Sequence, residues 1–148
     1  MKNTVSIKEN REFSYMYRRG NFLSSDCLII YYRKNRFPFN RLGITVSKKV
    51  GKAVIRNRVR RRIKESYREL EGSLPAAYDF VIVARSSAAS SDYHKIMSAL
   101  KYMLRKAGLL KLWKRFWFLQ LNFTENIYPV LKDTLPVGLF RPVRNTQF

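Results

Sequence analysis

Hydrophobic and polar residues near the start of the chain recur with helical spacing. Within residues 8–19 the apolar side chains Phe13, Met16 and Tyr17 fall at i, i+3 and i+4, which places them on one face of a helix. Gly20 follows directly, and glycine is typical of a position where a helix ends. This first pattern therefore predicts a short amphipathic helix.

Three later segments have the patterns of β-strands. Residues 26–34 are rich in β-branched and aromatic side chains, and residues 41–49 alternate between apolar and polar positions. Residues 80–86 form a nearly continuous apolar run, which is typical of a strand buried on both faces. Loops with proline or glycine are predicted over residues 35–40 and 72–79.

Two further helices follow from a period of about 3.6 residues. The first is predicted over residues 52–71, with one apolar stripe that consists of Ile55, Val59, Ile63, Tyr67 and Leu70. The second is predicted over residues 93–108, with Asp92 as its cap and Gly108 as its end. Helix, strands, helix, strand and helix in this order predict a sheet with helices packed on it.

The pattern changes beyond residue 108. The stretch LLKLWKRFWFLQLNF is dense in large apolar residues but is interrupted by lysine and arginine, and three later prolines exclude one continuous helix. We therefore predict a folded domain over residues 1–108 and a divergent tail over residues 109–148. No run of about 20 uncharged apolar residues occurs, so no membrane-spanning helix is predicted.

Charge narrows the choice of partner. Thirty Lys and Arg residues face ten Asp and Glu, a formal net charge of +20, and self-repulsion of this size opposes a compact state unless a polyanion relieves it. Nucleic acid, an anionic membrane surface and an acidic protein are the candidate partners. The start of the chain lacks the apolar core of a signal peptide, and Cys27 is the only cysteine, so we expect a cytoplasmic protein without disulfides.

The charge is concentrated in residues 46–69, VSKKVGKAVIRNRVRRRIKESYRE. On the predicted helix, Arg56 falls beside the apolar stripe, and the arc opposite the stripe consists of Asn57, Arg58, Arg60, Arg61, Arg62, Lys64 and Arg68. A solvated helix face normally mixes both signs, because like charges at i, i+4 cost stability, yet only Glu65 and Glu69 dilute this one. Arginine grips phosphate oxygens with two hydrogen bonds and stacks on bases, which favours nucleic acid as the partner.

Groups that could act together in catalysis are scarce. His94 is the lone histidine and is expected at the surface near a helix start, while Cys27 lies in an apolar strand pattern typical of an inert buried thiol. The acids are scattered, and no glycine-rich phosphate loop occurs. We therefore do not expect a protein that catalyses a reaction by itself.

Aromatic residues raise two alternatives. Phe13 and Tyr17 share a face of the first predicted helix, and Tyr31 lies on the first predicted strand. These rings could belong to the core. Beside a basic surface they could instead form stacking platforms for the unpaired bases of single-stranded RNA or DNA.

The segment RLGITVSKKVGKAVIRNRVRRRIKESYRE closely resembles the protein subunit of bacterial ribonuclease P. The opening KENREFSYMYRRG and the later YDFVIVARSSAA also resemble segments of that family, in the same order, over roughly residues 5–108. The resemblance implies an α/β domain of α+β sandwich type, with a small, mostly antiparallel sheet, helices packed on it and the order αβββαβα. It also implies a left-handed βαβ crossover, against the strong general preference for right-handed ones.

The resemblance further implies a division of labour. In this family the RNA subunit, with Mg²⁺, removes the 5′ leader of precursor tRNA, and the protein binds that RNA and the leader. No cofactor is expected on the protein itself. The residues that match the helix facing the RNA subunit are Arg56, Asn57, Arg58, Arg60, Arg61 and Arg62, with Lys48, Lys49 and Lys52 at its approach. Phe13, Tyr17 and Tyr31 match the cleft that receives the leader.

Two other functions stay open from the sequence. One is a generic basic nucleic-acid-binding protein, such as a ribosome-associated factor. The other uses the aromatic tail as an anchor on an anionic membrane surface. The tail itself departs from the family, whose members usually end soon after the last helix.

Overall fold

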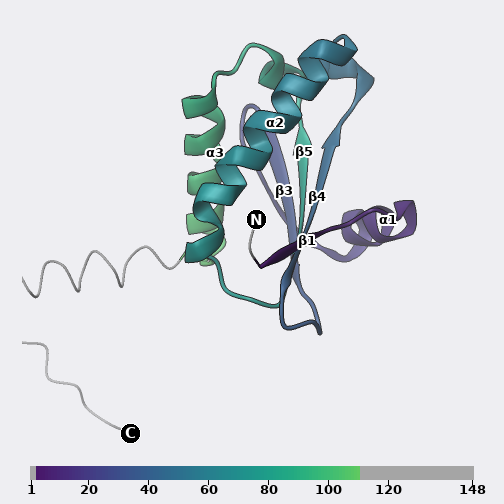
Figure 1. Ribbon diagram of the computed structural model, residues 1–148, viewed down its shortest axis with the longest axis vertical. Helices are drawn as coiled ribbons and strands as arrows, with labels where there is room; N and C mark the ends of the chain where they lie inside the picture. The colour runs from purple at the N-terminus through teal and green to yellow at the C-terminus, as the bar shows by residue number, and fades with distance from the viewer. Residues whose placement is uncertain (1–2, 111–148) are drawn as a thin grey trace, which may run out of the picture. The chain divides into compact units, whose positions relative to one another are not determined.

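The structure is a computed structural model that describes residues 3–110, and the predicted tail lies outside them apart from residues 109 and 110. Within these residues, five strands form one sheet with three α-helices packed on it (Figure 1). The strands are β1 (Thr4–Ser6), β2 (Asn21–Ser24), β3 (Leu28–Lys34), β4 (Asn40–Val46) and β5 (Tyr78–Ala84). The helices are α1 (Asn10–Arg19), α2 (Ala53–Leu70) and α3 (Tyr93–Lys106), with short 3-10 turns at Lys48–Val50, Glu71–Ser73 and Ser86–Ala89.

The strand order in the sheet is β1-β4-β5-β3-β2. β4 pairs in parallel with β1 and with β5, while β3 pairs antiparallel with β5 and with β2. The predicted class, helices packed on a small sheet, is confirmed. The sheet is mixed rather than mostly antiparallel, because β1 adds a parallel pair. This strand precedes the first predicted helix and is too short, at three residues, for a period to show it.

The connection from β4 through α2 to β5 has the left-handed form. In Figure 1, α2 lies in front of the sheet, both strands run upward, and β5 lies to the left of β4. The crossover brings β5 between β4 and β3, so that three seven-residue strands form the centre of the sheet.

The main core lies between the sheet and the pair α2 and α3. The predicted stripe of α2 is buried here, with Val59, Ile63 and Tyr67 fully covered and Ile55 half-buried at the helix start. From the sheet, the buried partners are Leu28, Ile30, Leu42, Phe80 and Ile82, and from α3 they are Ile96, Leu100, Met103 and Leu104. Burial of this stripe leaves the rest of α2 facing away from the core.

The ends of the helices follow the sequence signals. The side chain of Asp92 accepts a hydrogen bond of 2.7 Å from the backbone of Lys95, which caps α3 as predicted. Gly108, with φ of +69°, follows the end of that helix. Cys27 is a buried free thiol, and His94 is exposed at the start of α3. Among residues 3–110, no helix is both long and apolar enough to cross a membrane.

The second face of the sheet carries α1. Met16 of this helix is buried with Ile7 and Val81, and Phe13 packs against them. Gly43 permits the close approach of α1, because a Cβ atom at this position would lie 2.5 Å from Cε1 of Phe13. Within residues 3–110, α1 thus covers only part of this face of the sheet.

Candidate nucleic-acid interface

The side of α2 that faces away from the core is a dense positive surface. Its exposed cations, together with those of the preceding turn, are Lys48, Lys49, Lys52, Arg58, Arg60, Arg61, Lys64 and Arg68, here called the basic face. Asn57 is exposed among them. The acids of α2 that border this face already have partners, because Glu65 pairs with Arg68 and Glu69 accepts a hydrogen bond from Tyr93.

The entry to α2 depends on a glycine. Gly51 has φ of +144°, a conformation that other residues rarely adopt, and it separates the 3-10 turn at Lys48–Val50 from the helix. Lys52 then serves as N-cap without a side-chain hydrogen bond, and the first turn of α2 carries no acid. The positive end of the helix dipole is therefore left for an external anion.

Two of the predicted arginines point back to the protein. Nη1 of Arg62 donates a hydrogen bond of 2.6 Å to the carbonyl of Ser91, in the loop before α3. Nη1 of Arg56 donates one of 2.9 Å to the carbonyl of Gly51. Both side chains are half-buried, so they hold the helix in place rather than stand free at its surface.

Three rings form a row on the side of the sheet that carries α1, with Tyr17 and Phe22 exposed and Tyr31 half-buried between them. Tyr17 of α1 meets Tyr31 of β3 edge to face, with ring centroids 5.1 Å apart, and Phe22 of β2 lies 5.9 Å beyond Tyr31. The hydroxyl of Tyr17 is 2.9 Å from that of Thr45 on β4, which fixes the ring over the sheet. We call Tyr17, Tyr31 and Phe22 the aromatic row.

Of the three rings predicted from the sequence to bind the leader, Phe13 does not belong to the aromatic row. It is half-buried over Gly43 and belongs to the packing between α1 and the sheet. Phe22 was missed, because β2 is only four residues long and shows no alternation in the sequence. Thr45 was missed although its strand was predicted, because its contact with Tyr17 depends on how α1 packs on the sheet. A phenylalanine flanked by Gly20, Asn21 and two serines was the available signal for an exposed ring.

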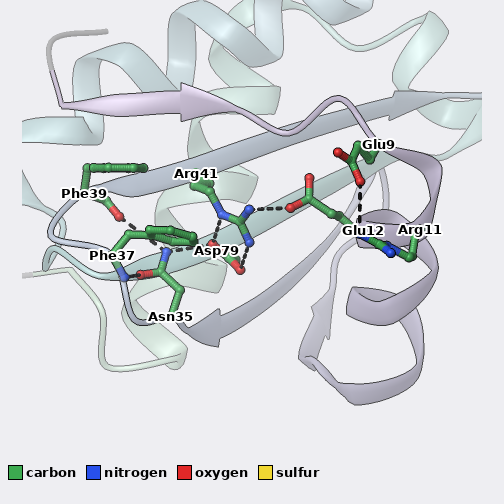
Figure 2. A network of polar contacts seen from close by, with 8 residues as sticks. All are labelled: Glu9, Arg11, Glu12, Asn35, Phe37, Phe39, Arg41 and Asp79. Atoms are coloured by element: carbon green, nitrogen blue, oxygen red, sulfur yellow. Dashed lines mark hydrogen bonds and ion pairs between the residues drawn. The ribbon is translucent and has the colours of Figure 1, made fainter.

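A polar network fixes the helix that carries Tyr17 (Figure 2). Arg41 of β4 donates through Nε and Nη2 to the two carboxylate oxygens of Asp79, at 2.8 and 2.7 Å, and through Nη1 to Glu12 of α1. Its guanidinium also lies 4.9 Å from the ring centre of Phe37. The hydrogen bonds to Asp79 and Glu12 outweigh the effect of partial burial and raise the pKa of Arg41 above its usual value.

Groups suited to protein-based chemistry do not converge in the described part of the chain. Within residues 3–110, no three His, Cys, Asp or Glu side chains form a group that could hold a metal ion. The paired carboxylates, Glu12 and Asp79, are both occupied by Arg41. What these residues do offer is charge on one helix and stacking surface on the neighbouring sheet.

A mixed sheet with the basic face of α2 on one side and solvent-accessible aromatic rings on the side that carries α1 defines a class: a small α/β protein with surfaces suited to a polyanion. The chain belongs to the ribonuclease P protein family, whose family model, described as Ribonuclease P, matches residues 1–108. It is therefore a protein component of ribonuclease P, a tRNA-processing enzyme in which the protein partners an RNA subunit.

Curated relatives and solved structures agree on this family. The chain is 51% identical over 104 residues to the ribonuclease P protein component of Clostridium botulinum (strain 657), covering 70% of this chain and 94% of the relative. It is 42% identical over 110 residues to the ribonuclease P protein component of Alkaliphilus metalliredigens, covering 74% of this chain and 99% of the relative. The solved RNase P protein of Staphylococcus aureus has a TM-score of 0.66 at 31% identity, over 71% of this chain and 96% of that one. The solved RNase P protein of Thermotoga maritima has a TM-score of 0.60 at 28% identity, and the match covers 66% of this chain and 92% of that one.

Proposed function

We propose that this chain binds the RNA subunit of ribonuclease P through the basic face and holds the 5′ leader of precursor tRNA on Tyr17 and Tyr31. The RNA subunit, with Mg²⁺, carries out the endonucleolytic cleavage. The protein contributes affinity and orientation, and it supplies no reacting group of its own.

The observation that carries this proposal is the separation of the two sides of α2. Its apolar stripe is buried, while eight cations of the basic face are exposed on the helix and the turn before it. Exposed like charges at this density repel one another, and neutralisation by phosphate groups relieves the repulsion. Arginine suits this partner because its planar fork matches two phosphate oxygens.

The leader suits the rings of Tyr17 and Tyr31, because it is single-stranded and its bases are free to stack. Tyr17 on α1 and Tyr31 on β3 meet edge to face over the side of the sheet that carries α1. Stacking of unpaired bases on aromatic side chains is tolerant of sequence, so one protein can serve many precursor tRNAs.

The protein also lowers the need for Mg²⁺ in this proposal. Cations on the basic face screen part of the phosphate repulsion within the RNA, so that fewer metal ions are needed to fold and load the RNA active site.

Reconstitution tests the proposal. The full chain is added to a bacterial ribonuclease P RNA at low Mg²⁺, and the release of the 5′ leader from precursor tRNA is measured. We expect clear stimulation over the RNA alone. Absence of stimulation, together with tight binding to unrelated RNA, would favour the generic nucleic-acid-binding function instead.

A further inference from the structure

Phe22 is the most exposed aromatic side chain of residues 3–110, with 64% of its surface accessible. It lies on β2, the last strand at one edge of the sheet. A phenylalanine in this position leaves a large apolar face in water, at a cost that the fold of residues 3–110 does not recover by covering the ring.

The place of Phe22 is set by strand register. Phe22 is paired directly across from Tyr31, so both rings stand on the side of the sheet that carries α1. Their ring centroids are 5.9 Å apart with planes inclined by 35°. Tyr31 in turn meets Tyr17. The aromatic row therefore runs from α1 across β3 to the free edge of the sheet, and Phe22 is its outer end.

We propose that Phe22 is an additional nucleotide-binding position, where one unpaired base of the leader stacks beyond those held at Tyr17 and Tyr31. This inference rests on the proposed function and assigns a further binding residue to it. The ring offers its open face to the base, while Tyr31 supports the opposite side.

Groups next to Phe22 suit the rest of a nucleotide. Arg18 and Arg19 are exposed in the last turn of α1, directly before β2, and can meet the phosphate. Among residues 3–110, β2 has a strand neighbour on one side only, so its outer backbone edge can pair with the same ligand.

A purely structural role for Phe22 makes a different prediction. Aromatic pairs across two strands stabilise a sheet by themselves, so Phe22 could serve only to hold β2 against β3. In that case its replacement lowers thermal stability and weakens all ligands alike. A stacking role instead affects only substrates whose leader reaches the ring.

The experiment compares Phe22→Leu and Phe22→Trp with the unaltered chain in the complete complex with a bacterial ribonuclease P RNA. Precursor tRNAs with leaders lengthened one nucleotide at a time are used, and their dissociation constants are measured. Tyr102→Leu is the matched control, since Tyr102 is 58% exposed on α3, away from the aromatic row. Melting temperatures and the affinity for leaderless tRNA report on folding.

For Phe22→Leu we expect about five- to tenfold weaker binding, the lower part of the range for base stacking, and only for leaders longer than a threshold length. Phe22→Trp retains or increases the affinity for these leaders. A leader with 5-iodouridine at the threshold position should crosslink to the peptide that contains Phe22.

Equal leader-length profiles for Phe22→Leu and the unaltered chain overturn this inference and leave the proposed function standing. A uniform loss for every substrate, with a lower melting temperature, overturns it in favour of the structural role. A complete absence of leader dependence in the unaltered complex refutes leader binding itself, and the inference with it.

Discussion

At the scale of single residues, aromatic rings pack against both faces of the sheet. Phe13 lies over Gly43 on one side, and Tyr67 is fully covered on the other, 5.8 Å from the ring of Phe80. The Tyr67 hydroxyl is 3.4 Å from that of Thr4, which joins β1 to α2. Because burial disfavours the phenolate, it raises the pKa of Tyr67 to about 12.

We predict that Tyr67 makes the fold less stable in alkali. The folded state keeps the proton of Tyr67 up to about pH 12, whereas the unfolded chain loses it near pH 10. The stabilising contribution of roughly 2–3 kcal/mol is therefore complete below pH 10 and is lost as the pH rises to 12. Denaturant melts should show a smaller decline over this interval for Tyr67→Phe. Equal declines in both proteins would contradict the prediction.

At the scale of elements, α2 has two kinds of arginine. Arg60 and Arg61 are exposed and make no hydrogen bond or ion pair within residues 3–110 that would occupy them. Arg62, the next residue, is tied to the Ser91 carbonyl in the loop before α3. Adjacent positions on one helix thus divide into a surface for a ligand and an anchor for the fold.

This division predicts opposite effects of neighbouring substitutions. In the double variant Arg60→Gln, Arg61→Gln, the slope of log affinity against log salt concentration should become shallower by about 0.7–0.9 for each phosphate that is no longer neutralised. The melting temperature should stay nearly unchanged. Arg62→Met should cost roughly 1–3 kcal/mol of stability, because it removes a charge-assisted hydrogen bond. Calorimetry measures the effect on stability, and titration with RNA measures the effect on binding. A large drop in stability of the double variant would mean that Arg60 and Arg61 are structural.

The second prediction at this scale concerns Arg41, which holds α1 in position on the sheet. Arg41 binds Asp79 with two hydrogen bonds and Glu12 with a third, which a lysine cannot reproduce from one ammonium group. Arg41→Lys should therefore loosen α1 and displace Tyr17 from Tyr31. We expect weaker binding of precursor tRNA with a leader, with unchanged binding of leaderless tRNA and of the RNA subunit. Equally weakened binding of both substrates would refute a positioning role.

At the scale of the whole molecule, the net charge of +20 predicts that the affinity for RNA depends steeply on salt. If each of the eight exposed cations of the basic face neutralises one phosphate, the logarithm of the RNA affinity should fall with the logarithm of salt with a slope of about −6 to −7. Fluorescence anisotropy over a salt series measures this slope. A flat response would rule out phosphate neutralisation as the source of affinity.

The sequence predicted what depends on local pattern. The apolar stripe of α2, the cap at Asp92 and the buried run of β5 are all confirmed, since each rests on spacing along one segment. It could not separate Arg62 from Arg61, because the Ser91 carbonyl reaches Arg62 only through the packing of α2 on α3. Nor could it place Phe22 in a row with Tyr31, because that depends on strand register and on a strand too short to show a period.

The strand order has a consequence for synthesis of the chain. β5 is the last strand to be made, yet it lies between β4 and β3, which do not pair with each other. Until residue 84 leaves the ribosome, the β2–β3 hairpin and the β1–β4 pair have no common partner. The segment of α2 therefore leaves the ribosome before β5 can complete the sheet on which its apolar stripe is buried.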